Sequence, residues 1–340
     1  MKNFLTSISM FFDNLKGFLM AVIIVLAIFF VVIGVAHNIL KIREIYMEDT
    51  TGYKNHVWVD ENRMNVQITG EGENTIVILS DFASASPIIQ YKTYVDKLSN
   101  YYRVVLVEYF GYGYSLSTKE ERTSTQIAHE IKTALEQCGI GGTYTILANG
   151  NSSLYAYTYT NLYPEEVARL VVVNGIYPDS IKEEFIKKYY KNQQTNSIIS
   201  SYMEITGINR ILSYLKPEEF GIDKMEEYGF SKEDIALYRK MIASKYYTPT
   251  MRRESKKLME NIEAVKNYEF PDYLPVTQIL SKEYVQEFKT YKKDKFINKD
   301  IEEYAKDIIT NPEIQEVVIV EGNRNLNIYN PDAVVNAIVN

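Results

Sequence analysis

Few residues in this chain of 340 residues can act as a nucleophile, an acid–base catalyst or a soft metal ligand. The sequence contains one cysteine, Cys138, and three histidines, His37, His56 and His129. A single cysteine can form neither an internal disulfide nor a cysteine-rich metal site. The histidines lie beside an apolar run, in an expected strand and in an expected helix. We therefore expect each histidine to have a structural role.

Sequence motifs for binding phosphates, metals and dinucleotides are absent. There is no P-loop, no H-E-x-x-H and no acidic loop of the calcium-binding type. Gly111 and Gly113 form a G-x-G pair, but the third glycine of a dinucleotide motif is missing. The net charge of −7 offers no broad basic surface to nucleic acid. We expect no metal ion, no cofactor and no nucleic-acid partner.

An uncharged apolar run of 19 residues lies near the N-terminus, at 18–36. At about 1.5 Å per residue it nearly matches a hydrocarbon core of about 30 Å, and it exceeds the apolar run of an ordinary signal peptide. We predict a single-pass transmembrane helix between a tail at 1–17 and a linker at 37–55. Gly34 and Ala36 resemble a cleavage site, so removal of the segment stays an alternative. The flanking basic residues leave the orientation open.

Beyond the linker, apolar β-branched runs alternate with helical stretches. Strands are expected at 56–60, 63–69, 75–80, 103–108, 143–148, 169–174, 275–280 and 316–320. Such runs separated by helices are typical of an α/β protein with a mostly parallel sheet and helices on both faces. A long charged, Tyr-rich stretch between two of these strands predicts a helical lid at about 178–270.

Five segments, in this order, resemble motifs of the α/β-hydrolase family. They are SDFASASP (80–87), YRVVLVEYFGYGYS (102–115), ERTSTQIAHEI (121–131), the segment 144–174 with its YP-x-x-V turn, and VVIVEGNRNLNIYNPDAV (317–334). They match the family's oxyanion loop, G-x-G turn, following helix, nucleophile elbow and histidine loop. The resemblance covers residues 56–340 and implies an α/β-hydrolase-like domain with a helical lid.

The resemblance also implies a location for the domain. Relatives with one N-terminal anchor are bacterial and usually expose the hydrolase domain outside the cytoplasm. We therefore expect a single-pass protein of the cell membrane with its globular domain on the extracytoplasmic side.

The family's catalytic positions are altered in this sequence. The elbow has the form G-x-S-x-G in the family, and Gly150 stands at the nucleophile position. Glycine has no side chain to attack a substrate. Arg324 stands at the histidine position, where it stays protonated and cannot accept a proton. Glu283 occupies the place of the acid, and we predict a salt bridge from Glu283 to Arg324.

The oxyanion loop has one unusual residue. By resemblance, the backbone N–H groups of Asn151 and Phe82 are the oxyanion donors, and they survive the loss of the nucleophile. Asp81 stands where the family usually has glycine, and a carboxylate there opposes developing negative charge. With Asn149 and Ser152, these residues form the candidate ligand pocket.

Other residues have a weaker case for function. The tyrosine pairs 101–102, 189–190 and 246–247 line a pocket under the lid, bind a partner or are half-buried packing residues. Glu108 and Glu321 are expected to be ordinary carboxylates at loop edges.

Three functions remain open on the sequence. The first is a membrane-anchored, catalytically inactive α/β-hydrolase homologue that binds a small molecule or a protein in its former active-site pocket. The second is an active ester or amide hydrolase that uses a relocated serine, Ser152 or Ser153. The third is an unrelated binding or transport accessory protein whose sheet only resembles that of the family. If the pocket is intact but disarmed, Gly150→Ser together with Arg324→His is expected to bring some esterase activity.

Overall fold

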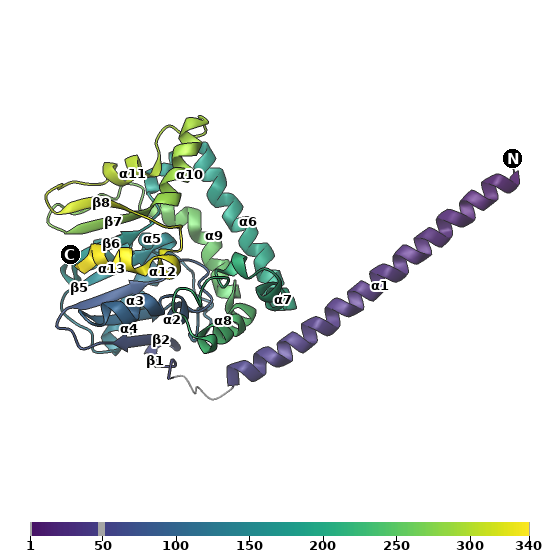
Figure 1. Ribbon diagram of the computed structural model, residues 1–340, viewed down its shortest axis with the longest axis horizontal. Coiled ribbons are helices and arrows are strands. Elements are labelled where there is room, and N and C mark those ends of the chain that lie inside the picture. The colour runs from purple at the N-terminus through teal and green to yellow at the C-terminus, as the bar shows by residue number, and fades with distance from the viewer. Residues whose placement is uncertain (1, 47–51, 340) are drawn as a thin grey trace.

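The N-terminal apolar run lies in one long helix, α1 (Lys2–Tyr46), which extends away from the rest of the chain in the computed structural model (Figure 1). The structure describes residues 2–46 and 52–339, so part of the predicted linker, 47–51, lies outside the described residues. The stretch from Leu15 to Glu44 is long and apolar enough to cross a membrane, and its apolar part is not buried against protein. The helix continues through the predicted tail and through the first part of the predicted linker.

The remainder is built on one eight-stranded sheet in the order β1-β2-β4-β3-β5-β6-β7-β8. The strands are β1 (His56–Val59), β2 (Asn62–Thr69), β3 (Thr75–Leu79), β4 (Arg103–Glu108), β5 (Tyr144–Asn149), β6 (Val167–Val173), β7 (Val276–Ser281) and β8 (Gln315–Val320). Strand β2 is antiparallel to both of its neighbours, and all other pairs are parallel. The predicted mostly parallel sheet is confirmed.

Helices cover both faces of the sheet. One face carries α2 (Pro87–Gln90), α3 (Lys92–Leu98), α12 (Leu326–Tyr329) and α13 (Pro331–Val339), and the other carries α4 (Ser124–Gln137), α5 (Ser153–Leu162), α10 (Lys282–Lys293) and α11 (Ile301–Asp307). Alternate side chains of each buried strand point to opposite faces: Val77 and Leu79 pack in one layer, and Ile76 and Ile78 pack in the other. This two-sided burial explains the continuous apolar runs in the sequence.

A helical insertion separates β6 from β7 and lies along one side of the sheet (Figure 1). After a short turn at Pro178–Lys182 it contains α6 (Glu184–Thr206), α7 (Ile208–Leu215), α8 (Lys232–Lys245) and α9 (Pro249–Ala264), here called the lid helices. The loops that follow β3, β5, β6 and β8 meet beneath these helices, at the carboxyl edge of the parallel strands. Ligand sites of open α/β sheets commonly lie at this edge.

Candidate functional site

The turn after β5 has the geometry of a sharp strand-to-helix elbow. Strand β5 ends at Asn149, a single helical turn covers Gly150–Ser152, and α5 begins at Ser153. Gly150 has φ +56°, a left-handed conformation that residues with a Cβ rarely adopt. The elbow predicted at this position is therefore formed, with glycine at its apex.

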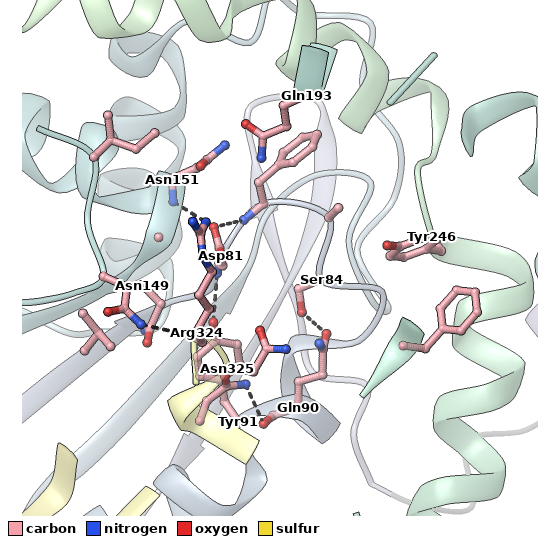
Figure 2. A pocket seen from close by; sticks show the side chains of 18 of the residues that line it. Asp81, Ser84, Gln90, Tyr91, Asn149, Asn151, Gln193, Tyr246, Arg324 and Asn325 are labelled. Atoms are coloured by element: carbon pink, nitrogen blue, oxygen red, sulfur yellow. Dashed lines mark hydrogen bonds between the residues drawn. The ribbon is translucent and has the colours of Figure 1, made fainter. Parts of the chain in front are cut away.

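The carboxylate of Asp81 fills the space above this apex. A Cβ atom added to Gly150 would lie 2.2 Å from both Cγ and Oδ1 of Asp81. The Oδ1 atom accepts hydrogen bonds from the backbone N–H of Asn151 (2.8 Å) and of Phe82 (2.6 Å). These are the two N–H groups predicted as oxyanion donors, and Figure 2 shows both bonds converging on Asp81. The chain thus supplies its own anion to the donor pair.

The Asp81 side chain lines the cavity below the lid helices and is exposed there. The protein around it nevertheless removes enough water to raise the pKa of the carboxyl from 3.8 to about 6. The two backbone hydrogen bonds and the positive charge of Arg324 favour the ionised form, but burial outweighs them. The Oδ2 atom makes no hydrogen bond to any residue that the structure describes, so it can accept one from a ligand.

Arg324, in the loop after β8, contacts α10 and the lid. Its guanidinium forms an ion pair with Glu287 (2.5 Å) and donates a hydrogen bond to the hydroxyl of Tyr189 (2.9 Å). It also lies over the ring of Tyr284, 4.5 Å from the ring centroid. In Figure 2 the arginine extends toward Asp81. A guanidinium held in this way supplies positive charge and hydrogen-bond donors, but no base.

These groups line one cavity of about 240 Å³. Amide side chains contribute much of its polar wall: Gln90, Asn149, Asn151, Asn174, Gln193, Asn325 and Asn327. The tyrosine pairs 189–190 and 246–247 also line it, whereas Tyr101 lies on the surface, 56% exposed. The cavity is therefore a polar pocket between the sheet edge and the lid helices.

The chain was compared with family models, with curated proteins and with solved structures. No family model matches the chain. Over 215 residues it is 22% identical to the uncharacterized protein YbdG of Bacillus subtilis (strain 168), a match over 63% of this chain and 56% of YbdG. The chain thus spans little more than half the length of that curated relative.

Solved structures superpose on a larger part of this chain than the part that aligns with YbdG. The epoxide hydrolase VrEH1 from Vigna radiata superposes over 84% of this chain and 96% of its own, with a TM-score of 0.62 and 18% identity. CarC, a serine hydrolase involved in carbazole degradation, superposes over 84% of this chain and 96% of its own, with a TM-score of 0.52 and 15% identity. The chain has the α/β-hydrolase fold. At these identities the likeness shows the fold alone.

Within the α/β-hydrolase fold, Glu283 is not the partner of Arg324. Glu283 lies in the first turn of α10, exposed, and lines a separate surface groove with Glu321. The ion pair that we predicted between Glu283 and Arg324 is not formed, and Arg324 pairs one helical turn further on, with Glu287. Residues four apart share a face of a helix, and the loop after β8 brings Arg324 to Glu287, one turn beyond the predicted Glu283.

Ser152 faces the protein interior and not the cavity. Its side chain is fully buried, and its hydroxyl lies 3.0 Å from the carbonyl oxygen of Leu79 and accepts a hydrogen bond from the N–H of Asn149. The hydroxyl of Ser153 is likewise buried and accepts from the N–H of Ile176. Both serines hold the elbow in place, as expected of residues at the start of a helix.

The histidines do not approach these serines. His56 contacts the carbonyl of Tyr114, and His129 contacts the hydroxyl of Tyr163. His37 lies against Gly207, on the lid. A serine nucleophile in this fold has no imidazole beside it to remove its proton.

Glu108 is not a loop-edge carboxylate, contrary to the sequence prediction. It is fully buried and accepts hydrogen bonds from the N–H groups of Tyr114 (2.7 Å) and Ile88 (3.3 Å). A Cβ added to Gly113 would lie 1.9 Å from its Oε1 atom, so the G-x-G turn closes over the carboxylate. Glu108 therefore links this turn to α2, the helix that follows the Asp81 loop.

The sequence offered no signal for two residues of the site. Glu287 is an ordinary polar position of a helix, and only the fold places it beside Arg324. Asn174, with φ +48°, donates to the carbonyl of Arg324 (3.1 Å) and accepts from the N–H of Ser281 (2.8 Å). It thereby joins the ends of β6 and β7 to the arginine loop.

Proposed function

We propose that this protein is a membrane-anchored protein of the α/β-hydrolase fold that binds a ligand in its former active-site pocket and does not hydrolyse it. The observation that carries the proposal is the Asp81 carboxylate, which accepts both oxyanion N–H groups above Gly150. A substrate carbonyl cannot take these donors while the carboxylate holds them. The elbow also lacks a nucleophilic side chain, and the base position is an arginine.

The solved structures of the same fold include hydrolases, so the loss of activity has to be tested directly. A fluorophosphonate probe is added to the full chain in detergent, and the intact mass is read. We expect no adduct on folded protein. An adduct that disappears in Ser152→Ala would show a relocated nucleophile and overturn the inactive assignment.

The chemistry of the pocket points to a ligand rich in hydrogen-bond donors. Arg324 is ion-paired with Glu287, whereas the Asp81 carboxylate has a free lone-pair direction at Oδ2 and a second carboxylate, Glu219, also lines the cavity. The pocket therefore has excess negative charge and many amide and phenol partners, which favours a neutral or cationic polar molecule over an anion. At about 240 Å³ the cavity suits a small molecule.

Binding is tested by thermal shift on the full chain with defined probes. Glucose, N-acetylglucosamine and spermidine represent neutral and cationic donors, and acetate and phosphate represent anions. We expect stabilisation from the donor group only, and its loss in Asp81→Ala. The exposed Asp272→Ala is the matched control. Stabilisation by the anions alone, or an unchanged response in Asp81→Ala, would contradict this ligand class.

The anchor is part of the same proposal. Helix α1 is long and apolar enough to span a bilayer, and the sequence resemblance supports an extracytoplasmic domain. A Tyr101→Cys variant in a Cys138→Ser background can be treated with a membrane-impermeant maleimide on intact cells. Labelling is expected if the domain lies outside, and labelling only after lysis would place it in the cytoplasm.

A further inference from the structure

Two lid helices have their polarity reversed. Over the second half of α6, the buried side chains are Ser197, Ser201 and Glu204, whereas the exposed ones are Ile198, Ile199, Tyr202 and Ile205. On α7, Asn209 and Ser213 are buried, whereas Ile211, Tyr214 and Leu215 are exposed, Leu215 to 72%. Helices of soluble proteins bury their apolar side, so this surface, here called the outer lid face, is built to contact something apolar.

The membrane helix reaches the same place. The side-chain amide of Asn38 donates to the carbonyl of Ile205 (3.3 Å), and Lys41 forms an ion pair with Glu204. Asn38 lies two residues beyond the predicted span at 18–36, a rise of about 3 Å. The outer lid face therefore begins at the level where the apolar part of α1 ends.

A second contact fixes α7 to α1. Arg210 binds both carboxylate oxygens of Glu44, at 2.9 and 2.8 Å. Gly207, between α6 and α7, allows the close approach of His37: a Cβ at this glycine would lie 2.6 Å from the Cβ of His37. Figure 1 shows α6 and α7 on the side of the domain that faces α1. These contacts hold the outer lid face close to the bilayer surface.

The charge of this segment suits an anionic bilayer. From the start of α6 to the end of α7, residues 184–215, there are four basic and two acidic residues, Glu184 and Glu204, in a chain whose net charge is −7. Glu204 is buried and paired with Lys41, so it does not oppose the approach of anionic headgroups. Tyr202 and Tyr214 are exposed, and tyrosine is enriched at the membrane interface. Apolar side chains flanked by lysines are the pattern of an interfacial helix.

We propose that the outer lid face of α6 and α7 inserts into the interfacial region of an anionic lipid bilayer, the one that α1 spans. This inference rests on the proposed membrane anchor. Since Tyr189 and Gln193 of α6 line the polar cavity, the bilayer would hold one wall of the ligand pocket in place.

The test measures the depth of single tryptophans in the full chain. The native Trp58 is replaced by Phe, and the protein is placed in nanodiscs of phosphatidylcholine and phosphatidylglycerol with brominated acyl chains, which quench tryptophan on contact. Three variants are compared: Phe29→Trp in α1, Tyr202→Trp on the outer lid face, and Tyr101→Trp as the control. Tyr101 and Tyr202 are similarly exposed, at 56% and 59%, but only Tyr202 lies on the lid.

Quenching of the Phe29→Trp and Tyr202→Trp variants, but not of Tyr101→Trp, is the expected result. Quenching of Phe29→Trp alone would leave the anchor standing and overturn the inference about the lid. A Tyr202→Trp variant with blue-shifted but unquenched emission would show that a second copy or another protein covers the face, which also overturns it. An unquenched Phe29→Trp variant would remove the anchor and the inference together. Unchanged quenching of Tyr202→Trp in Lys188→Glu/Lys191→Glu would contradict the role of anionic headgroups.

Discussion

The carboxylate of Asp81 lies where the side chain of residue 150 would lie in an elbow with a nucleophile. Its Cγ atom is 2.2 Å from the position of a Cβ on Gly150, far inside any van der Waals contact. With a serine at 150, the Asp81 side chain therefore has to leave this position and give up its hydrogen bonds to the N–H groups of Asn151 and Phe82. The two residues form a matched pair, and a change at one site constrains the other.

This relationship alters the outcome expected for restored catalytic residues. Gly150→Ser with Arg324→His should remain inactive, because the serine collides with Asp81. Adding Asp81→Gly frees the space, so the triple variant should gain fluorophosphonate labelling and some hydrolysis of p-nitrophenyl acetate. An active double variant, or a folded triple variant without labelling, would show that the pocket is organised differently.

The strain at position 150 can be measured separately. Gly139 has φ +68° and nothing within 4 Å of an added Cβ, so Gly139→Ser reports the backbone cost alone, about 1 kcal/mol. We expect Gly150→Ser to lower the free energy of unfolding by clearly more, and Asp81→Gly to recover the difference in a double-mutant cycle. Equal losses for the two serine variants would mean that Asp81 moves aside without cost.

Much of this architecture could be predicted from the sequence, because its signals are local. The β-branched runs gave all eight strands, and the order of motifs placed Gly150 at the elbow and Arg324 in the loop after β8. The role of Asp81 could not be predicted, since it depends on two loops 69 positions apart meeting at the sheet edge. The same limit applies to the ion pair of Lys41 with Glu204 and to the choice of Glu287 over Glu283.

The raised pKa of Asp81 predicts a pH dependence of stability. The folded protein holds this proton up to about pH 6, whereas the unfolded chain releases it near 3.8. The folded state therefore binds more protons between these values, so stability falls as pH rises through this window and stays lower above it. In Asp81→Asn the amide oxygen can still accept both N–H groups and nothing titrates. The Tm of this variant relative to the parent should rise from about pH 4 to 7, and a constant difference would contradict the assignment.

Arg324 should lower the pH at which Asp81 loses its proton in the folded protein. Its positive charge favours ionised Asp81, so Arg324→Met should move the pH midpoint of the Asp81 contribution upward. Lys282→Met is the control, because Lys282 forms an exposed ion pair with Glu321 away from the cavity. The midpoint is read from the pH at which the Tm difference between each variant and its Asp81→Asn derivative changes. Equal midpoints in the two methionine variants would show that Arg324 does not act on Asp81.

A buried ion pair beneath the lid should dominate the stability of this region. Arg122 and Glu130 are 0% and 1% exposed, and the guanidinium donates to both carboxylate oxygens at 2.7 and 2.8 Å. Arg122→Met would leave Glu130 buried without its partner, which typically costs about 3–5 kcal/mol. Adding Glu130→Met should recover part of this loss, since two apolar side chains leave no unpaired charge at that position.

The matched surface pair is Lys92 with Asp96, at side-chain exposures of 34% and 55%. Lys92→Met should cost no more than about 1 kcal/mol, because water screens an exposed pair. Denaturant unfolding of the parent and the three variants measures these losses. A small loss for Arg122→Met, or a further loss on adding Glu130→Met, would mean that water reaches the pair and that the lid does not seal it.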